Sequence, residues 1–172
     1  MKNHGKDRIY AVLGAGKQGT AAAYDVLRFG EADRVSMADS DLECAQESAA
    51  RLRALVPEWA ERVSAHRVDA SDDASLADFL APVRVLLSAV PYHMHPRVAV
   101  AAIGAGTSMC DLGGNTGVAL RTLALGEEAE AAGVSIVPDC GLAPGLVNTL
   151  AVYGMEGMDA CREVQLRCGG LP

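Results

Sequence analysis

The chain has 172 residues, half of them hydrophobic, so it can bury the core of one domain without disulfides. Its net charge of −7 and isoelectric point of about 5.0 argue against nucleic acid or an anionic membrane as the main partner. No apolar run is long enough to cross a bilayer, and the polar start is unlike a signal peptide. The five cysteines form no C-x-x-C pair. We therefore expect a cytoplasmic protein with reduced thiols.

Strand-like and helix-like segments alternate along the chain. Apolar runs predict six strands, at 9–13, 35–38, 63–68, 83–90, 107–111 and 134–137. The intervening segments predict helices at 20–27, 41–56, 74–80, 97–105 and 117–132, with a last helix ending near 154. This alternation predicts an α/β fold: a doubly wound, Rossmann-type parallel sheet of about six strands with helices on both faces.

The end of the chain has a different pattern. Residues 161–168 partly alternate polar and apolar side chains, which predicts a seventh strand, and no helix follows to cover it. We interpret this strand as the opening of an incomplete second domain. The predicted domains are therefore 1–157, which binds a dinucleotide, and 158–172, which begins a substrate and oligomerisation domain.

The loop after the first strand reads Gly-Ala-Gly-Lys-Gln-Gly over 14–19. Between a strand and a helix, this G-x-G-x-x-G pattern is typical of dinucleotide binding. The first glycine allows the tight turn, the second leaves room for a pyrophosphate, and the third lets the helix approach the strand. The free N–H groups of the helix then face the phosphates. The predicted phosphate-binding residues are Gly14, Gly16, Lys17, Gln18 and Gly19.

An acidic residue follows the second strand at the spacing this motif requires. Asp39 lies 20 positions after Gly19, where a carboxylate can accept hydrogen bonds from the ribose hydroxyls of the adenosine. Asp39 and Ser40 are the predicted cofactor-binding residues of this loop, and the next residue is again acidic, with no Arg or Lys beside them. Because a carboxylate would repel a 2′-phosphate, the sequence favours NAD over NADP.

Two further strand-end loops are candidates for the cofactor, because ligands bind at the carboxyl ends of parallel strands. Asp69 and Ala70 could approach the adenine, although an Asp there also serves as a turn or helix cap. Ala89, Val90 and Pro91 could lie along the nicotinamide ribose, or could simply end a strand.

No general base can be assigned from the sequence. Tyr92, Asp111 and Asp139 are weak catalytic candidates at strand ends, and either aspartate could instead bind backbone donors of its own loop. His93 and His95 lack a third metal ligand at a recognisable spacing, so we interpret them as the polar start of a helix and expect no metal.

Four segments together resemble the saccharopine dehydrogenase-like oxidoreductases, and most closely the lysine 6-dehydrogenases. They are VLGAGKQG at 12–19, SAVP at 88–91, CDLGGN at 110–115 and PDCGLAPGL at 138–146. The ending CGGLP at 168–172 also resembles the crossing of that family into its second domain. The likeness covers the whole chain but about half of a typical family member.

The resemblance implies oxidation of an amine-bearing carbon, with NAD accepting the hydride. The reaction would be deamination of the lysine ε-carbon to the semialdehyde, or oxidation of a secondary amine of the saccharopine type. It implies a small amine or amino acid as substrate and a homo-oligomer for the complete protein. Since most substrate contacts in the family belong to the second domain, we expect this chain alone to bind NAD with little turnover.

The alternative from another class is a non-catalytic NAD-sensing module. Such modules share the glycine motif, the acidic end of the second strand and an aspartate loop after the third. They are not expected to carry the loops at 113–115 and 139–145, so we favour the enzyme.

Overall fold

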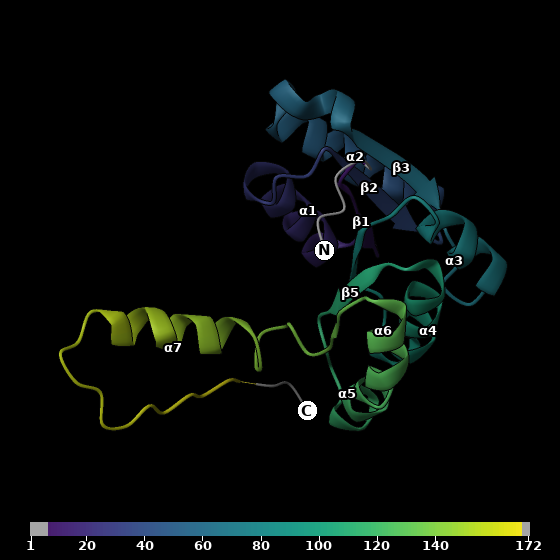
Figure 1. Cartoon of the computed structure of the whole chain (residues 1–172). Coiled ribbons are helices and arrows are strands. Elements are labelled where there is room, and N and C mark those ends of the chain that lie inside the picture. The colour runs from purple at the N-terminus through teal and green to yellow at the C-terminus, as the bar shows by residue number, and fades with distance from the viewer. Residues whose placement is uncertain (1–6, 170–172) are drawn as a thin grey trace.

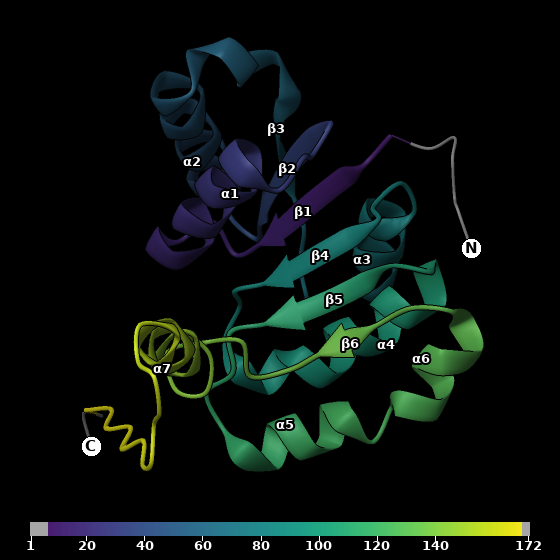
Figure 2. The ribbon, with the colours of Figure 1, turned by 60° about the vertical axis from the view of Figure 1, so that its left-hand side comes forward.

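The computed structural model describes residues 7–169, in which six parallel strands form a sheet in the order β3-β2-β1-β4-β5-β6. The chain winds outward from β1 through β2 to β3, returns to β4 beside β1, and winds outward again (Figure 2). The doubly wound prediction is confirmed. The strands are β1 (Ile9–Leu13), β2 (Arg34–Asp39), β3 (Val63–Arg67), β4 (Val85–Ser88), β5 (Ser108–Asp111) and β6 (Ile136–Val137).

Helices cover both faces of the sheet (Figure 1). α1 (Lys17–Phe29) and α2 (Leu42–Leu55) pack on one face, against β1, β2 and β3. α3 (Asp73–Leu80) and α4 (His95–Ala105) pack on the other. The short helices η1 (Pro57–Arg62) and η2 (Tyr92–Met94) precede β3 and α4.

Two apolar cores follow from the alternation of side chains along the strands. In β1, Ala11 and Leu13 point into the core beneath α3 and α4, whereas Val12 points into the core beneath α1 and α2. Burial on both faces explains why the strands read as continuous apolar runs. Ala45 and Ala49 of α2 are fully buried, so small side chains let this helix lie close to the sheet.

The helix predicted over 117–132 is two helices in the structure, α5 (Thr116–Leu123) and α6 (Gly126–Ala132). Leu125 has φ −84° and ψ 12°, outside the helical range, and its N–H bonds to the carbonyl of Thr122, three residues earlier. This tighter turn and the weak helix former Gly126 interrupt the α-helix. The prediction of one continuous helix was wrong.

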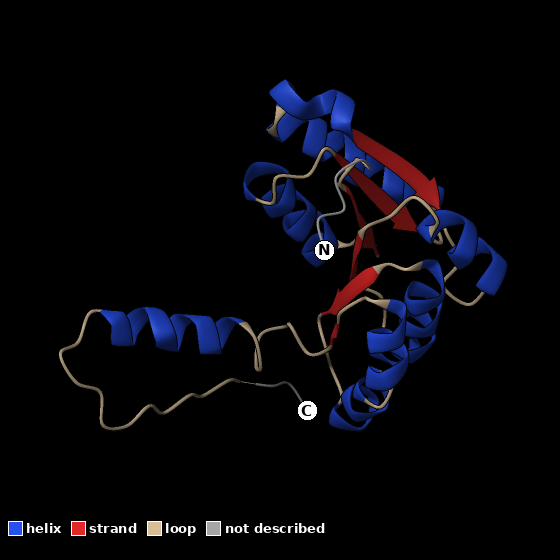
Figure 3. Cartoon of the chain, in the orientation of Figure 1, coloured by secondary structure: helices blue, strands red, loops and turns tan. Residues whose placement is uncertain are grey.

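The last described segment lies away from the sheet. α7 (Leu146–Glu156) contains no buried residue and projects to the side in Figure 1. Residues 158–169 form neither helix nor strand and are drawn as loop in Figure 3. The strand predicted over 161–168 was therefore wrong. A strand needs a neighbour to pair its N–H and C=O groups, and no strand of the described residues lies beside this segment.

Candidate functional site

The loop between β1 and α1 is tightly packed at two of its three glycines. Gly14 has φ +104°, and a Cβ there would lie 2.7 Å from the carbonyl of Ala89 at the end of β4. A Cβ on Gly19 would overlap the carbonyl oxygen of Gly14. In contrast, a Cβ on Gly16 would meet no atom within 4 Å. The loop is therefore fixed against β4 and α1, while the space over Gly16 is open.

The start of α1 is suited to an anion. Gly16 is the N-cap and supplies no side-chain hydrogen bond, so the first N–H groups of α1 lack a side-chain cap. No acidic residue lies in the first turn, whereas Lys17 does, and it is exposed. Together with the positive end of the helix dipole, these groups form an electropositive surface beside the open space.

Asp39, at the end of β2, holds this loop in place. Its Oδ2 accepts a hydrogen bond from the N–H of Ala15 at 2.8 Å. Its Oδ1 accepts hydrogen bonds from the N–H of Asp41 at 3.1 Å and the hydroxyl of Ser40 at 3.3 Å. The side chain is half-buried, and Oδ2, which accepts one hydrogen bond, has a second lone pair with which Asp39 can accept a hydrogen bond from a ligand.

A cation that the sequence motifs do not reveal lies beside Asp39. Arg67, at the end of β3, pairs in register with Asp39, and its Nε donates to the carbonyl of Ser40 at 3.3 Å. Arg67 is exposed, and its two terminal nitrogens have no hydrogen-bond partner within residues 7–169. The two residues lie 28 positions apart, so their proximity depends on the pairing of β2 with β3.

Asp69 forms a turn of its own. Its Oδ1 accepts hydrogen bonds from the N–H of Ser71 at 2.8 Å and the Ser71 hydroxyl at 2.6 Å. These bonds hold the pKa of Asp69 below its usual value. Ala70 is buried. The turn-forming interpretation thus accounts for the contacts of Asp69, and its contact with an adenine remains a prediction.

A second group of candidates gathers where β4, β5 and β6 end. Tyr92 packs against Gly114, because a Cβ on that glycine would lie 3.0 Å from the Tyr92 Cβ. A Cβ on Gly113 would overlap the carboxylate of Asp139. Both glycines have positive φ, which keeps the loop close to its neighbours. Tyr92 and Asp139 therefore flank the same Gly-Gly loop, although they lie far apart in sequence.

The two candidate aspartates have different environments. Asp111 is 2% exposed, and its Oδ1 accepts hydrogen bonds from the N–H groups of Gly113 at 2.8 Å and Asp139 at 3.0 Å. Its own carbonyl accepts from Cys140 at 2.7 Å. Asp111 therefore binds backbone N–H groups of the surrounding loops, which is one of the two roles that the sequence left open for it. Asp139 is half-exposed, so its carboxylate is the more accessible of the two.

The interpretation of both histidines as a polar helix start was wrong for one of them. His93 is exposed, but His95 is buried between Ser88 and Asp111. The sequence did contain a signal, because Val98, Ala99 and Ala102 share the buried face of α4 with His95 at spacings of three, four and seven.

The cysteines at this edge are not activated nucleophiles. Burial raises the pKa of the Cys110 thiol to about 11 and also raises the pKa of Cys140 above its usual value. The thiolate is the reactive form of cysteine. These shifts agree with a site that does not depend on thiol chemistry.

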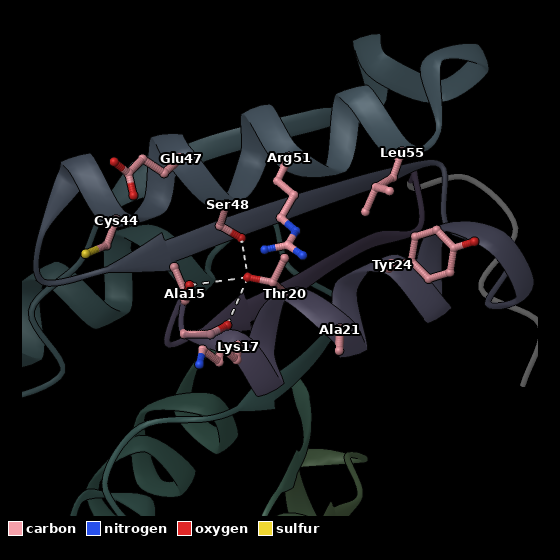
Figure 4. A pocket seen from close by; sticks show the side chains of 11 residues that line it. Ala15, Lys17, Thr20, Ala21, Tyr24, Cys44, Glu47, Ser48, Arg51 and Leu55 are labelled. Atoms are coloured by element: carbon pink, nitrogen blue, oxygen red, sulfur yellow. Dashed lines mark hydrogen bonds between the residues drawn. The ribbon is translucent and has the colours of Figure 1, made fainter.

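A groove of about 830 Å³ runs between α1 and α2 and opens at the glycine loop (Figure 4). Thr20 forms the floor of this groove. Its hydroxyl lies 2.9 Å from the carbonyl of Gly16 and 2.8 Å from the Ser48 hydroxyl, which joins α1 to α2. The Arg51 side chain extends over this floor. The groove borders the outer side of the loop and not the ends of β4 and β5.

The fold, the open Gly16 at a helix N-terminus and the carboxylate of Asp39 define a dinucleotide-binding domain. A family model described as the saccharopine dehydrogenase NADP binding domain matches residues 10–137. The chain belongs to this family, which confirms the resemblance to saccharopine dehydrogenase-like proteins.

The matched relatives are much longer proteins. The mitochondrial alpha-aminoadipic semialdehyde synthase of Bos taurus is 34% identical over 107 residues, covering 58% of this chain and 11% of that protein. The NADP⁺-dependent, L-glutamate-forming saccharopine dehydrogenase of Saccharomyces cerevisiae is 31% identical over 109 residues, covering 61% and 24%. A solved apo structure of the L-Glu-forming yeast saccharopine dehydrogenase matches with a TM-score of 0.69 and 25% identity, over 87% of this chain and 31% of that one.

Proposed function

We propose that this chain is the cofactor domain of an NAD-dependent oxidoreductase that oxidises the amine-bearing carbon of an amino acid or polyamine. Family membership supports the oxidoreductase class, since the matched relatives are named for saccharopine or aminoadipic semialdehyde chemistry. The lysine ε-carbon is the substrate position we favour, with a saccharopine-type secondary amine next. The bound nicotinamide would accept the hydride in either reaction.

The proposed cofactor is NAD, and Asp39 is the observation that supports it. Its carboxylate lies beside Ala15 at the glycine loop, where a 2′-phosphate would meet negative charge. Arg67 and the NADP in the family description favour the other cofactor. We give Asp39 more weight, because it is half-buried and held by three hydrogen bonds, whereas Arg67 is exposed.

We assign the remaining residues by their place at the sheet edge. Gly14, Gly16 and Gly19 with the first turn of α1 would hold the pyrophosphate. Ala89, Val90 and Pro91 would lie along the nicotinamide ribose, and Asp69 and Ala70 near the adenine. Tyr92 and Asp139 would face the substrate, with Asp111 holding their loop.

Titration calorimetry with NAD, NADP and no further substrate tests the cofactor assignment. We expect a saturable heat of binding for NAD and a lower affinity for NADP. If NADP binds more tightly than NAD, Arg67 and not Asp39 sets the preference. If neither binds, the proposed function is wrong.

Absorbance of the reduced cofactor in the presence of lysine, saccharopine and related amines tests the reaction. We expect turnover from the full-length protein and very little from these 172 residues. NAD binding with no turnover by the full-length protein on any amine would favour a sensing module instead.

Three organisational predictions accompany this proposal. We propose a domain boundary after residue 157, a homo-oligomer for the complete protein and a cytoplasmic location. Among residues 7–169, no helix is long and apolar enough to span a membrane. Sedimentation of the full-length protein tests the oligomer, and limited proteolysis near 157 tests the boundary.

A further inference from the structure

Three buried polar side chains lie together between the two candidate regions. Ser88 ends β4, His95 begins α4 and Asp111 ends β5, and each is at most 2% exposed. Polar groups are rarely buried this completely without partners. An apolar side chain at the start of α4 would fill the same space without any hydrogen-bond partner. Packing alone therefore does not account for a buried imidazole at this position.

The His95 ring spans from one strand end to the other. Its Nδ1 lies 3.1 Å from the Ser88 hydroxyl. Its Nε2 lies 3.9 Å from Oδ1 of Asp111, which is too far for a direct hydrogen bond. A neutral imidazole has one donor and one acceptor, so the ring can hydrogen-bond the Ser88 hydroxyl through Nδ1 while Nε2 packs beside the carboxylate.

The two strand ends beside the ring each continue into a proposed ligand-binding loop. Ser88 is followed by Ala89, whose carbonyl lies against Gly14 of the phosphate-binding loop. On the other side, the Asp111 carboxylate holds the N–H groups of Gly113 and Asp139. The pairing of β4 with β5 places Ser88 beside Asp111, and the imidazole packs across these two strand ends, where it can orient the Ser88 hydroxyl.

We propose that His95 is a positioning residue for the nicotinamide half of the cofactor, acting through its hydrogen bond with Ser88 at the end of β4. This inference rests on the proposed dinucleotide function. In a doubly wound sheet the β1–β3 half holds the adenosine, and the half that begins with β4 holds the second nucleotide. His95 lies wholly in the second half, so its loss should affect nicotinamide contacts and spare adenosine contacts.

The charge state of the ring agrees with this role. Burial lowers the pKa of His95, while the carboxylates of Asp111 and Asp139 and the backbone of Gly113 oppose that shift, and His93 adds to it. The ring is therefore neutral at neutral pH. A neutral ring can hydrogen-bond Ser88 without drawing the Asp111 carboxylate away from the N–H groups that it holds.

The test compares NAD with ADP, which lacks the nicotinamide nucleoside, by titration calorimetry on the whole chain. His95→Leu should weaken NAD binding about tenfold, as loss of one buried hydrogen-bonding group predicts, and leave ADP binding within about twofold. His95→Asn, which can still reach the Ser88 hydroxyl, should restore most of the NAD affinity. The exposed His93→Leu is the matched control and should change neither affinity.

The outcomes separate the two proposals. If the parent chain binds no NAD, the proposed function fails. If the parent binds NAD and a folded His95→Leu keeps the parent ratio of NAD to ADP affinity, the positioning role is wrong, and equal weakening of both ligands counts against it as well. Should His95→Leu not fold, Ser88→Ala removes the hydroxyl that His95 contacts and provides the same ratio, and an unchanged ratio in that variant would overturn the inference.

Discussion

Oδ2 of Asp39 accepts a hydrogen bond from the backbone N–H of Ala15 at 2.8 Å, so one side chain both shapes the glycine loop and presents a carboxylate beside it. These two roles can be separated by mutation. Asparagine keeps an oxygen acceptor for Ala15 and loses the charge, whereas alanine loses both.

The first prediction concerns cofactor choice. Asp39→Ala should weaken NAD binding about tenfold or more, because hydrogen bonds to a charged group are worth about 1.5–3 kcal/mol. Asp39→Asn should weaken NAD less and narrow the gap between NAD and NADP, because the charge that repels a 2′-phosphate is gone. Calorimetric titration of each variant with NAD and with NADP measures these affinities.

Arg67→Gln is the companion variant, since Arg67 lies beside Asp39 and is exposed. It should leave NAD affinity unchanged and lower any residual NADP affinity. Equal NAD affinity in Asp39→Ala and the parent would rule out Asp39 as the ribose-binding residue.

The second prediction uses the open space over Gly16. Gly16→Val should fold, because a Cβ there meets no atom within 4 Å, and should bind NAD far more weakly, because the side chain occupies the pyrophosphate space. Circular dichroism and calorimetry measure the two properties. The same substitution at Gly104, which also has open space around it, should alter neither. A folded Gly16→Val with parental NAD affinity would place the phosphates elsewhere.

The local parts of this site could be predicted from the sequence. Gly14 and Gly16 lie in one loop, and Asp39 follows at a fixed spacing, so their arrangement depends on consecutive elements only. Arg67 could not be placed, because its position depends on which strand pairs with β2. His95 was misplaced although its helical spacing to Val98 and Ala102 indicates the buried face of α4. The strand predicted near the C-terminus failed for a related reason, since alternation of side chains does not supply a pairing partner.

The third prediction separates the packed sheet from the projecting helix. Leu52 of α2 is fully buried, so Leu52→Ala should lower the free energy of unfolding by about 2–5 kcal/mol. Leu150 of α7 is 57% exposed, and Leu150→Ala should change it by less than about 0.5 kcal/mol. Urea denaturation measures both. A large loss from Leu150→Ala would show that α7 is packed against an apolar surface in solution.

The last prediction concerns pH. Burial lowers the pKa of His95 and of His66, so the folded protein binds these protons less readily than the unfolded chain, whose histidines titrate near 6.5. The free energy of unfolding should therefore fall as pH drops below about 6.5, by at most about 1.4 kcal/mol per pH unit from the buried His95 and by less from His66, which is exposed to solvent. His95→Asn should reduce this slope, and His66→Asn should remove a further part. Urea denaturation between about pH 7.5 and about pH 5.5, one unit either side of the histidine titration, measures the slope. If the free energy of unfolding of both variants depends on pH as it does in the parent, neither histidine is held neutral in the folded protein.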